Sequence, residues 1–391
     1  MKGLSLEGAR VLDARLTRRA LVRGALLASV VGVLAACGDG RPEAGEGGSA
    51  SAPASVEASA TPHAPAGVSS SPTAARVETP LATAASSAFP VAIEHKFGVT
   101  EIPAQPQRVV ALGYSDQDPL LALGVRPIAV RYWFGDEPHA VFPWAQDELG
   151  DATPDVLNMP FGQLDFERVA ALRPDLISAV YSGITQEEYQ RLAQIAPTLA
   201  QSSEYIDFGM PWQEATLLIG RALGREALAH ELVTEVEARF AAARAGHPEW
   251  AGKRVVVGSP RGDGQFGFVA SQDARSRVFT ALGFEVPPEL DEIAGGQFWG
   301  TVSLERADLL DQDLLVFHQL AWVEGGRAAI ESDPLLGRLR AMQEGRVLFL
   351  EGQLDDALQF STVLSLPFLL DRLVPMVEAA MDGDPETEAA P

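Results

Sequence analysis

Short β-forming runs alternate with helical stretches between residues 95 and 383, and this alternation constrains the fold more than any other feature of the chain. The apolar runs end in turn residues such as Gly113, as strands do when they lead into helices. This βαβα order predicts a parallel sheet with helices on both faces. In the first half of the region, we expect strands at residues 108–113, 127–130 and 175–180, and helices at residues 118–123, 166–172 and 187–195.

Residues 212–245 interrupt this alternation. Apolar side chains recur there at helical spacing and no proline occurs, although Gly220 and Gly224 weaken the middle of the stretch. We expect one helix about 50 Å long, ended by Pro248. Alternation then resumes, with strands expected at residues 254–258, 314–317 and 346–350, and helices at residues 273–282 and 335–344. The pattern predicts an α/β protein in which two Rossmann-like lobes are joined by one long backbone helix.

The two expected lobes also repeat a short sequence pattern. Residues 164–172 (LDFERVAAL) precede one strand, and residues 302–310 (VSLERADLL) precede another. In each segment, a Glu-Arg pair begins a helix, and an apolar run that is expected to be a buried strand follows. Two copies of one half-design predict pseudo-symmetric lobes that face a cleft, where ligands usually bind.

The single cysteine, Cys37, follows what looks like an export signal. Basic residues at 17–19 precede an apolar run at 24–36, which is too short for a membrane span of about 20 residues. Residues 34–37 (LAAC) look like a bacterial lipobox, in which cleavage leaves the cysteine first and its thiol carries a lipid. An ordinary signal peptide with a chance cysteine is the alternative, and Sec and twin-arginine export both stay open. We therefore assign residues 1–36 to a lipoprotein signal peptide.

The next segment differs in composition from the rest of the chain. Residues 37–90 are rich in Ala, Ser, Pro, Gly and Thr, and they bury too little apolar surface to offset their ordering entropy. We expect a disordered tether that holds the folded body off the membrane. The expected domains are an amino-terminal lobe at 91–211, the connecting helix at 212–246, a carboxy-terminal lobe at 247–383 and a frayed tail at 384–391.

Charge and residue usage exclude several classes of protein. Acidic residues outnumber basic ones 53 to 30, and a net charge of −23 argues against a nucleic-acid partner. One cysteine rules out a thiolate zinc site or an iron–sulfur cluster, and the six histidines lack metal-ligand spacing. Neither Ser115 nor Ser259 has the G-x-S-x-G setting of a nucleophile, so no enzyme is indicated. The G-x-G-x-x-G match at residues 262–267 continues as an extended run, which favours a glycine hairpin over a dinucleotide site.

Several short motifs, in order and at matched spacing, resemble one family. These motifs are His95-Lys96-Phe97-Gly98, Pro106-Gln107-Arg108-Val109-Val110, Leu123-Gly124-Val125-Arg126-Pro127, Leu172-Arg173-Pro174-Asp175-Leu176-Ile177, Ile195-Ala196-Pro197-Thr198, Ala222-Leu223-Gly224, Ser303-x-Glu305 and Gly345-Arg346-Val347. With them, the sequence resembles the substrate-binding lipoproteins of bacterial iron–siderophore ABC importers, the helical-backbone class III of periplasmic binding proteins. The stretch at residues 132–144 and Ser365-Leu366-Pro367 are most like actinobacterial members of that family.

This resemblance implies a function. The protein would bind a ferric siderophore in the cleft and deliver it to the transmembrane subunits of an ABC permease. It would be a monomer, lipid-anchored on the extracytoplasmic side, without cofactor or metal site of its own because the siderophore holds the iron. A rival hypothesis keeps the fold and changes the cargo to haem, cobalamin or another metal chelate. A surface sensing or adhesion module without transport is a second rival, and a secreted hydrolase, which no motif supports, is a third.

In the first lobe, candidate ligand contacts follow the expected strands. Tyr114 follows the first strand, Arg131, Tyr132 and Trp133 follow the second, and Tyr181 follows the third. Open α/β sheets bind ligands at this carboxyl edge. An arginine flanked by aromatic faces would suit the anionic oxygens and the catechol rings found in ferric siderophores.

In the second lobe, Arg261 and His318 follow strands, and Phe298 and Trp299 lie in a glycine-flanked loop. Exposed aromatic side chains on such a loop are costly unless something covers them. We expect Arg131 and Arg261 to be exposed at loop ends. For the aromatic residues of both lobes, a core position with a satisfied polar atom is the alternative.

Glu167 and Glu305 occupy equivalent places in the two repeated segments. In the family, one exposed glutamate per lobe meets arginines on the permease, so the resemblance assigns permease docking to this pair. The alternative is that each glutamate only stabilises a helix N-terminus.

Overall fold

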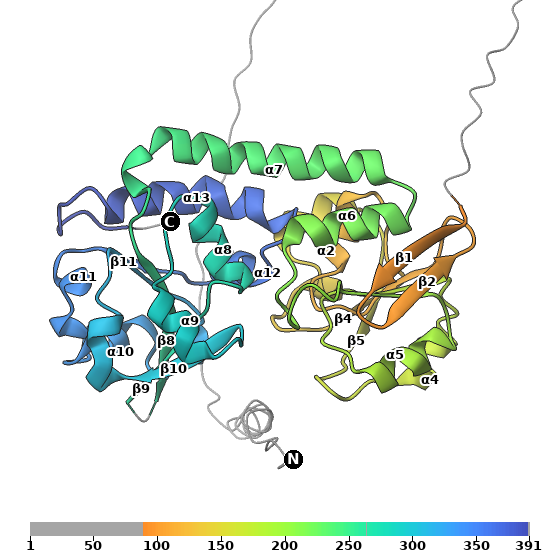
Figure 1. The fold of residues 1–391 in the computed structure, drawn as a ribbon, viewed down its shortest axis with the longest axis horizontal. Helices are drawn as coiled ribbons and strands as arrows, with labels where there is room; N and C mark the ends of the chain where they lie inside the picture. Colours follow the sequence, from red (N-terminus) through yellow and green to blue (C-terminus); the bar gives the residue numbers. More distant parts are fainter. Residues whose placement is uncertain (1–88, 263, 390–391) are drawn as a thin grey trace, which may run out of the picture. The chain divides into compact units, whose positions relative to one another are not determined.

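The computed structural model describes residues 89–262 and 264–389. The predicted signal peptide, Cys37 and nearly all of the predicted tether lie outside the described residues. Within them, two five-stranded sheets define two α/β lobes (Figure 1). We call the lobe with the sheet of order β5-β4-β3-β6-β7 the first lobe, and the lobe with the order β10-β9-β8-β11-β12 the second lobe.

All five strands of the first-lobe sheet are parallel, and a separate antiparallel hairpin, β1–β2, precedes them. The strands are β1 (Val91–His95), β2 (Gly98–Ile102), β3 (Val109–Ala111), β4 (Ala129–Arg131), β5 (Asp155–Leu157), β6 (Leu176–Ala179) and β7 (Thr198–Ala200). The helices are α2 (Gln117–Ala122), α3 (Gln146–Leu149), α4 (Phe166–Ala171) and α5 (Gln186–Ala193), with 3₁₀ turns at η2 (Pro138–Ala140) and η3 (Pro143–Ala145).

The strand β3 shows why its sequence is apolar throughout. Val109 and Ala111 pack into a core with residues of α2, whereas Val110 packs into a core with residues of α4 and α5. Successive side chains of a strand point to opposite faces, so a sheet covered by helices on both sides needs apolar residues at every position. The predicted parallel sheet is confirmed in this lobe.

The second-lobe sheet is mixed. Strands β8, β11 and β12 are parallel, whereas β9 pairs antiparallel with both β8 and β10. The predicted hairpin at residues 262–267 is confirmed, and it adds the antiparallel strand β9 to the parallel part of this sheet. The strands are β8 (Val255–Gly262), β9 (Gln265–Val269), β10 (Trp299–Ser303), β11 (Leu314–Phe317) and β12 (Val347–Phe349).

The helix expected at residues 335–344 is divided into a 3₁₀ turn and a short α-helix. The division falls at Leu339, whose backbone is extended, with φ −64° and ψ 137°. The second-lobe helices are α8 (Ala274–Ala281), α9 (Pro288–Ala294), α10 (Gly326–Glu331), α11 (Arg340–Gln343), α12 (Gln353–Phe360) and α13 (Ser365–Ala380). The 3₁₀ turns are η4 (Pro248–Trp250), η5 (Leu304–Leu309), η6 (Leu320–Trp322) and η7 (Leu336–Arg338).

The single connecting helix predicted at residues 212–246 is wrong, because the chain forms α6 (Trp212–Ala222) and α7 (Glu226–Gly246) instead. Gly224, with φ +66°, takes the left-handed conformation that ends a helix. The two helices then pack closely at Gly220, where an added Cβ would lie 2.4 Å from the Cβ of Ala229. The two glycines that weaken the helical pattern therefore mark a helix–helix corner.

The helix α7 connects the two lobes through their cores (Figure 1). Its Ala229 packs into the core beneath the first-lobe sheet, whereas Val236 and Phe240 pack into the core of the second lobe. The backbone helix expected between the lobes is therefore present, at Glu226–Gly246. Within residues 89–262 and 264–389, no helix combines the length and the apolar composition that crossing a membrane would require.

Candidate ligand-binding site

Aromatic side chains gather where three strands of the first lobe end. Tyr114 follows β3, Trp133 follows β4 and Tyr181 follows β6. The ring centre of Trp133 lies 5.7 Å from that of Tyr114 and 6.1 Å from that of Tyr181. The structure therefore brings these three predicted residues together at the carboxyl edge of the sheet.

These rings continue into the second lobe. Trp133 lies 5.4 Å from Phe360, the last residue of α12. Tyr181 lies 5.2 Å from Phe208, which in turn lies 5.9 Å from Phe298 ahead of β10. Aromatic pairs at such distances contribute about 0.5–1.5 kcal/mol beyond the area they bury. We call the set that joins the lobes the interlobe aromatic cluster; its members are Tyr114, Trp133, Phe134, Tyr181, Phe208, Phe298 and Phe360.

Arg131 binds the backbone beneath this cluster. Its side chain is buried, and its guanidinium donates to the carbonyl oxygens of Met159 at 2.7 Å and Pro160 at 3.0 Å. The guanidinium carbon lies 4.1 Å from the centre of the Tyr114 ring. The expectation that Arg131 is exposed at a loop end is therefore wrong, because the group is used to hold the loop after β5 against the end of β4.

Tyr132 lies apart from the interlobe aromatic cluster. Its hydroxyl donates to the carbonyl oxygen of Gly135 at 3.0 Å, and its ring packs against the first-lobe core that contains Val130. Since neighbouring residues after a strand point to opposite sides, Trp133 and Tyr132 cannot both face the cluster.

Arg261 and Trp299 form a more open patch on the second lobe. Arg261 is exposed near the end of β8, as expected, and its guanidinium carbon lies 6.0 Å from the centre of the Trp299 ring. Trp299 is 41% exposed. The Arg261 side chain lies across β9 at Gly267, where an added Cβ would come within 2.3 Å of its Nε atom. The patch therefore offers a cation and an aromatic face side by side.

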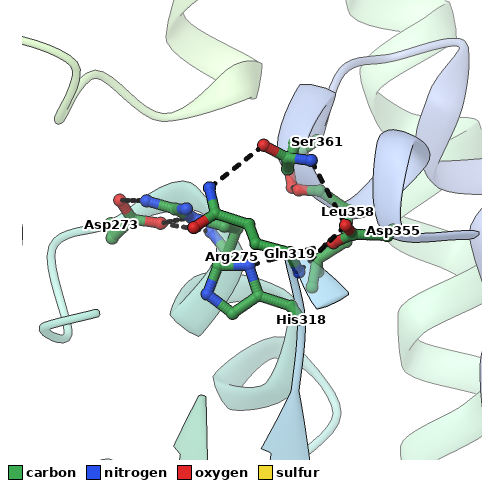
Figure 2. Close-up of polar contacts among 8 residues, drawn as sticks. Asp273, Arg275, His318, Gln319, Asp355, Leu358 and Ser361 are labelled. Atoms are coloured by element: carbon green, nitrogen blue, oxygen red, sulfur yellow. Dashed lines mark hydrogen bonds and ion pairs between the residues drawn. The ribbon is translucent and has the colours of Figure 1, made fainter. Parts of the chain in front are cut away.

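His318 is buried in a polar cluster of the second lobe, together with Asp355 (Figure 2). Its Nδ1 atom lies 3.8 Å from Oδ1 of Asp355, and neither atom has a hydrogen-bond partner among the described residues. Burial, reinforced by the positive charges of Arg275 and Arg261, lowers the pKa of His318 well below its ordinary value. The imidazole is therefore neutral, and contact with a ligand stays a prediction for this residue.

The same polar cluster contains a buried ion pair. The Nε and Nη2 atoms of Arg275 each donate to the carboxylate of Asp273 at 2.8 Å (Figure 2). The backbone amide of Gln319 donates to Oδ2 of Asp355 at 2.9 Å. Burial nevertheless raises the pKa of Asp355 to about 7. The charge of Arg275 is thus already balanced by Asp273.

A polar contact also joins the lobes. Asp118 of α2 is fully buried, and its Oδ2 atom accepts hydrogen bonds from Nε1 of Trp144, at 2.8 Å, and from Oγ1 of Thr362. Thr362 lies between α12 and α13, so this bond crosses from one lobe to the other. Burial raises the pKa of Asp118 to about 7, although both hydrogen bonds oppose the shift.

A small cavity lies between the lobes. A cavity of about 30 Å³ is lined by residues of both lobes, among them Asp116, Tyr181, Phe360 and Thr362. Sites for drug-sized ligands typically have volumes of about 300–1,000 Å³. Binding a larger molecule here therefore requires the rings or the lobes to move.

A larger cavity, of about 540 Å³, lies at the opposite edge of the second-lobe sheet. It is lined by Lys253, Asp313 and Arg346, which precede β8, β11 and β12. Lys253 lies 3.6 Å from Asp313, and Arg346 lies 2.9 Å from Glu344. Since these charges neutralise each other and the edge faces away from the aromatic cluster, we do not assign the ligand to this cavity.

Glu167 and Glu305 occupy similar local positions. Glu167 is exposed in the first turn of α4, after the capping residue Asp165. Glu305 is exposed in the first turn of η5, after the capping residue Ser303. The repeated sequence segment thus corresponds to a capped helical start in each lobe, with a 3₁₀ turn in the second.

Phe208, Phe360 and Asp118 were not predicted as site residues. Phe360 ends an amphipathic helix, whose periodicity assigns it to a core, and Asp118 lies in a helix start where carboxylates are common. Phe208 alone carried a usable signal, because it is a large apolar residue in the polar loop at residues 201–209.

Two α/β lobes whose strand ends meet across a ligand cleft are the architecture of a periplasmic binding protein. Residues 109–354 match the periplasmic binding protein family. The chain therefore belongs to this family, and the resemblance and the class III fold expected from the sequence are confirmed.

Individual relatives agree with this assignment. The ferric-anguibactin-binding protein FatB of Vibrio anguillarum is 27% identical over 301 residues, which cover 73% of this chain and 87% of FatB. A periplasmic solute binding protein from Mycobacterium smegmatis is 35% identical, with a TM-score of 0.66, covering 74% of this chain and 98% of that one. PiaA of Streptococcus pneumoniae, solved in complex with ferrichrome, is 27% identical, with a TM-score of 0.65. The match covers 75% of this chain and 99% of PiaA. Each relative is a binding protein.

The interlobe carboxyl group predicts a pH-dependent stability. Because the pKa of Asp118 rises to about 7 on folding, its stabilising contribution is complete below about pH 4 and is lost as the pH rises through 7. In the wild type, the unfolding free energy should therefore fall between about pH 4 and pH 8. In an Asp118→Asn variant this fall should be smaller by roughly 2–4 kcal/mol, at about 1.4 kcal/mol per pKa unit. Urea unfolding at each pH measures this, with Asp371→Asn, an exposed carboxylate on α13, as the control. Parallel pH profiles for wild type and Asp118→Asn would contradict the assignment.

Proposed function

We propose that this protein captures a ferric siderophore between its two lobes and delivers it to the permease of an ABC importer. No bond is made or broken in this function, which depends on ligand affinity and docking. Family membership and relatives named for ferric-anguibactin and ferrichrome support the proposal. The observation that carries it is the interlobe aromatic cluster, in which side chains of both lobes meet at the strand ends beside the exposed Arg261.

The chemistry of the cluster suits this cargo. A ferric siderophore presents oxygen donors, often with net negative charge, on a frame that can include aromatic rings. Aromatic faces bind such a frame, and a guanidinium binds its oxygens. Within the described residues, no group of three or more His, Cys, Asp or Glu side chains is placed to hold a metal ion. In this proposal the siderophore supplies every ligand of the iron.

The predicted ligand residues divide into two groups. The proposed direct contacts are Tyr114, Trp133, Tyr181, Arg261, Phe298 and Trp299. The other three residues support these contacts without touching the ligand. Arg131 binds the backbone, Tyr132 packs against the first-lobe core, and His318 lies in the buried polar cluster.

Tryptophan fluorescence tests the proposed function. Ferric siderophores should quench the intrinsic tryptophan emission of the protein, whereas haemin and cobalamin should not. We expect Arg261→Ala to weaken binding of an anionic ferric chelate by about 1.5–3 kcal/mol, the range for hydrogen bonds to charged groups. Arg239→Ala is the matched control, because this α7 arginine pairs with Asp371 at 3.0 Å, away from the cluster. Quenching by haemin or cobalamin alone would contradict the siderophore assignment.

We also propose that the protein is a monomer anchored through a lipid on Cys37, with residues 37–90 as its tether. The apolar run and the LAAC motif at residues 24–37 support this anchor. A Cys37→Ser variant should move from the membrane fraction to the soluble extracytoplasmic fraction, and immunoblotting of the fractions measures this. Retention of the variant on membranes after a high-salt wash would refute lipid anchoring.

Glu167 and Glu305 are the proposed permease contacts. Their exposure and their matched places after capped helix starts support this role. The double variant Glu167→Ala/Glu305→Ala should keep its siderophore affinity and lose uptake of radiolabelled iron, since a desolvated charge pair at an interface can cost about 2–5 kcal/mol when broken.

The control for this experiment is Glu187→Ala/Glu289→Ala. These exposed glutamates lie in the first turns of α5 and α9, one in each lobe. If Glu167 and Glu305 serve only their helix N-termini, both double variants should lose about 0.3–1 kcal/mol of stability per site and both should retain uptake. Normal uptake by the Glu167/Glu305 variant would end the docking assignment.

A further inference from the structure

Phe208 holds a central position between the lobes. It lies in the loop at residues 201–211, between β7 and α6. The ring centre of Phe208 lies within ring-contact distance of four others: Tyr181 at 5.2 Å, Phe298 at 5.9 Å, Phe161 at 6.1 Å and Tyr114 at 6.4 Å. Three of these rings belong to the first lobe and Phe298 to the second, so the Phe208 ring fills a slot whose walls are aromatic.

The floor of this slot is the backbone of Gly183. An added Cβ at Gly183 would lie 2.6 Å from the ring of Phe208 and 2.8 Å from that of Phe161, and its φ is +62°. The slot therefore depends on the absence of a side chain at this position. Phe161, at the outer side, is 55% exposed, so the slot opens to solvent there.

The backbone of Phe208 is strained. Its φ is +63°, in the left-handed region that the Cβ of a phenylalanine disfavours. Gly209, the next residue, accepts a hydrogen bond at its carbonyl oxygen from Nη1 of Arg277, on α8 of the second lobe. The loop is thus tied to the second lobe next to a strained residue, and strain of this kind is common at ligand clamps.

The charges around the slot limit what can bind beside it. Arg131 donates to backbone carbonyls, Arg275 to Asp273 and Arg277 to Gly209. Among the described residues, Arg261 alone of these four arginines has no hydrogen-bond or ion-pair partner, and it lies over the ring of Trp299. Aryl packing needs no further cation, so the aromatic walls can hold a ring of the chelate while Arg261 faces its charged oxygens.

We propose that the Phe208 ring is a placeholder in a slot that accepts an aryl group of the siderophore, so that the ligand is a catecholate or phenolate ferric chelate. This inference rests on the proposed function. An aryl group can replace the ring contacts of Phe208 with Tyr181 and Phe298. A hydroxamate or citrate chelate has no ring to exchange, so it would lose these contacts without replacement.

Calorimetric titration of the purified protein with three ferric probes tests the ligand class. The probes are the complexes with 2,3-dihydroxybenzoylserine, a catecholate; ferrichrome, a hydroxamate; and ferric dicitrate. We expect the catecholate to bind at least about tenfold tighter than the other two, consistent with ring stacking that they cannot make. Tighter binding of ferrichrome or dicitrate would overturn the ligand class and leave the proposed function intact. Binding of none of the probes would contradict the proposed function itself, and the inference with it.

Variants of Phe208 test the placeholder role. If Phe208 fills the slot in most molecules, only the small fraction with a vacant slot can bind, and the apparent affinity is lowered by that fraction. Phe208→Ala vacates the slot in every molecule, so it should bind the catecholate about five- to tenfold tighter than wild type. Phe208→Leu, which keeps apolar bulk without a ring, should show a smaller gain, and affinity for ferrichrome should not rise in either variant. The control is Phe166→Ala, whose ring packs 3.6 Å from the Arg191 guanidinium, outside the cluster. Catecholate binding that is unchanged or weaker in both Phe208 variants would overturn the placeholder role.

Discussion

The packing of α7 into two separate cores is the constraint on which the rest of the structure depends. Ala229, near its start, belongs to the first-lobe core, and Phe240, near its end, belongs to the second-lobe core. A single helix anchored by buried residues at both ends sets the spacing of the lobes. The carboxyl ends of the first-lobe strands can therefore face the second lobe, and the aromatic side chains at that edge contact Phe298 and Phe360.

The buried side chain of Arg131 supports the interlobe aromatic cluster from within the first lobe. A buried guanidinium is tolerated only when its donors are paired, and the carbonyl oxygens of Met159 and Pro160 provide the pairing. The same group lies against the ring of Tyr114. One charged side chain thus fixes one loop and one ring of the cluster, which explains why a residue expected at the ligand surface lies beneath it.

Much of the scaffold could be predicted from the sequence, because strand positions such as Val109–Ala111 carry apolar residues on both faces. The same apolar runs predicted where the carboxyl edge of the first-lobe sheet lies. They therefore also predicted that Tyr114, Trp133 and Tyr181, which follow these strands, come together. The break between α6 and α7 was missed because helical periodicity persists across Gly224. Burial of Arg131 and the contacts of Phe208 depend on tertiary packing between segments far apart in the chain, which local patterns do not record.

The hydrogen bond from Thr362 to Asp118 joins residues 244 positions apart. In chain order, the whole first lobe precedes Thr362, so this bond closes only after the second lobe has formed around α12 and α13. Contacts of such long sequence separation form late in folding. Burial in the folded protein raises the pKa of Asp118 to about 7, so folding near neutral pH takes up a proton at this residue. Folding is therefore linked to protonation at a contact that also joins the lobes.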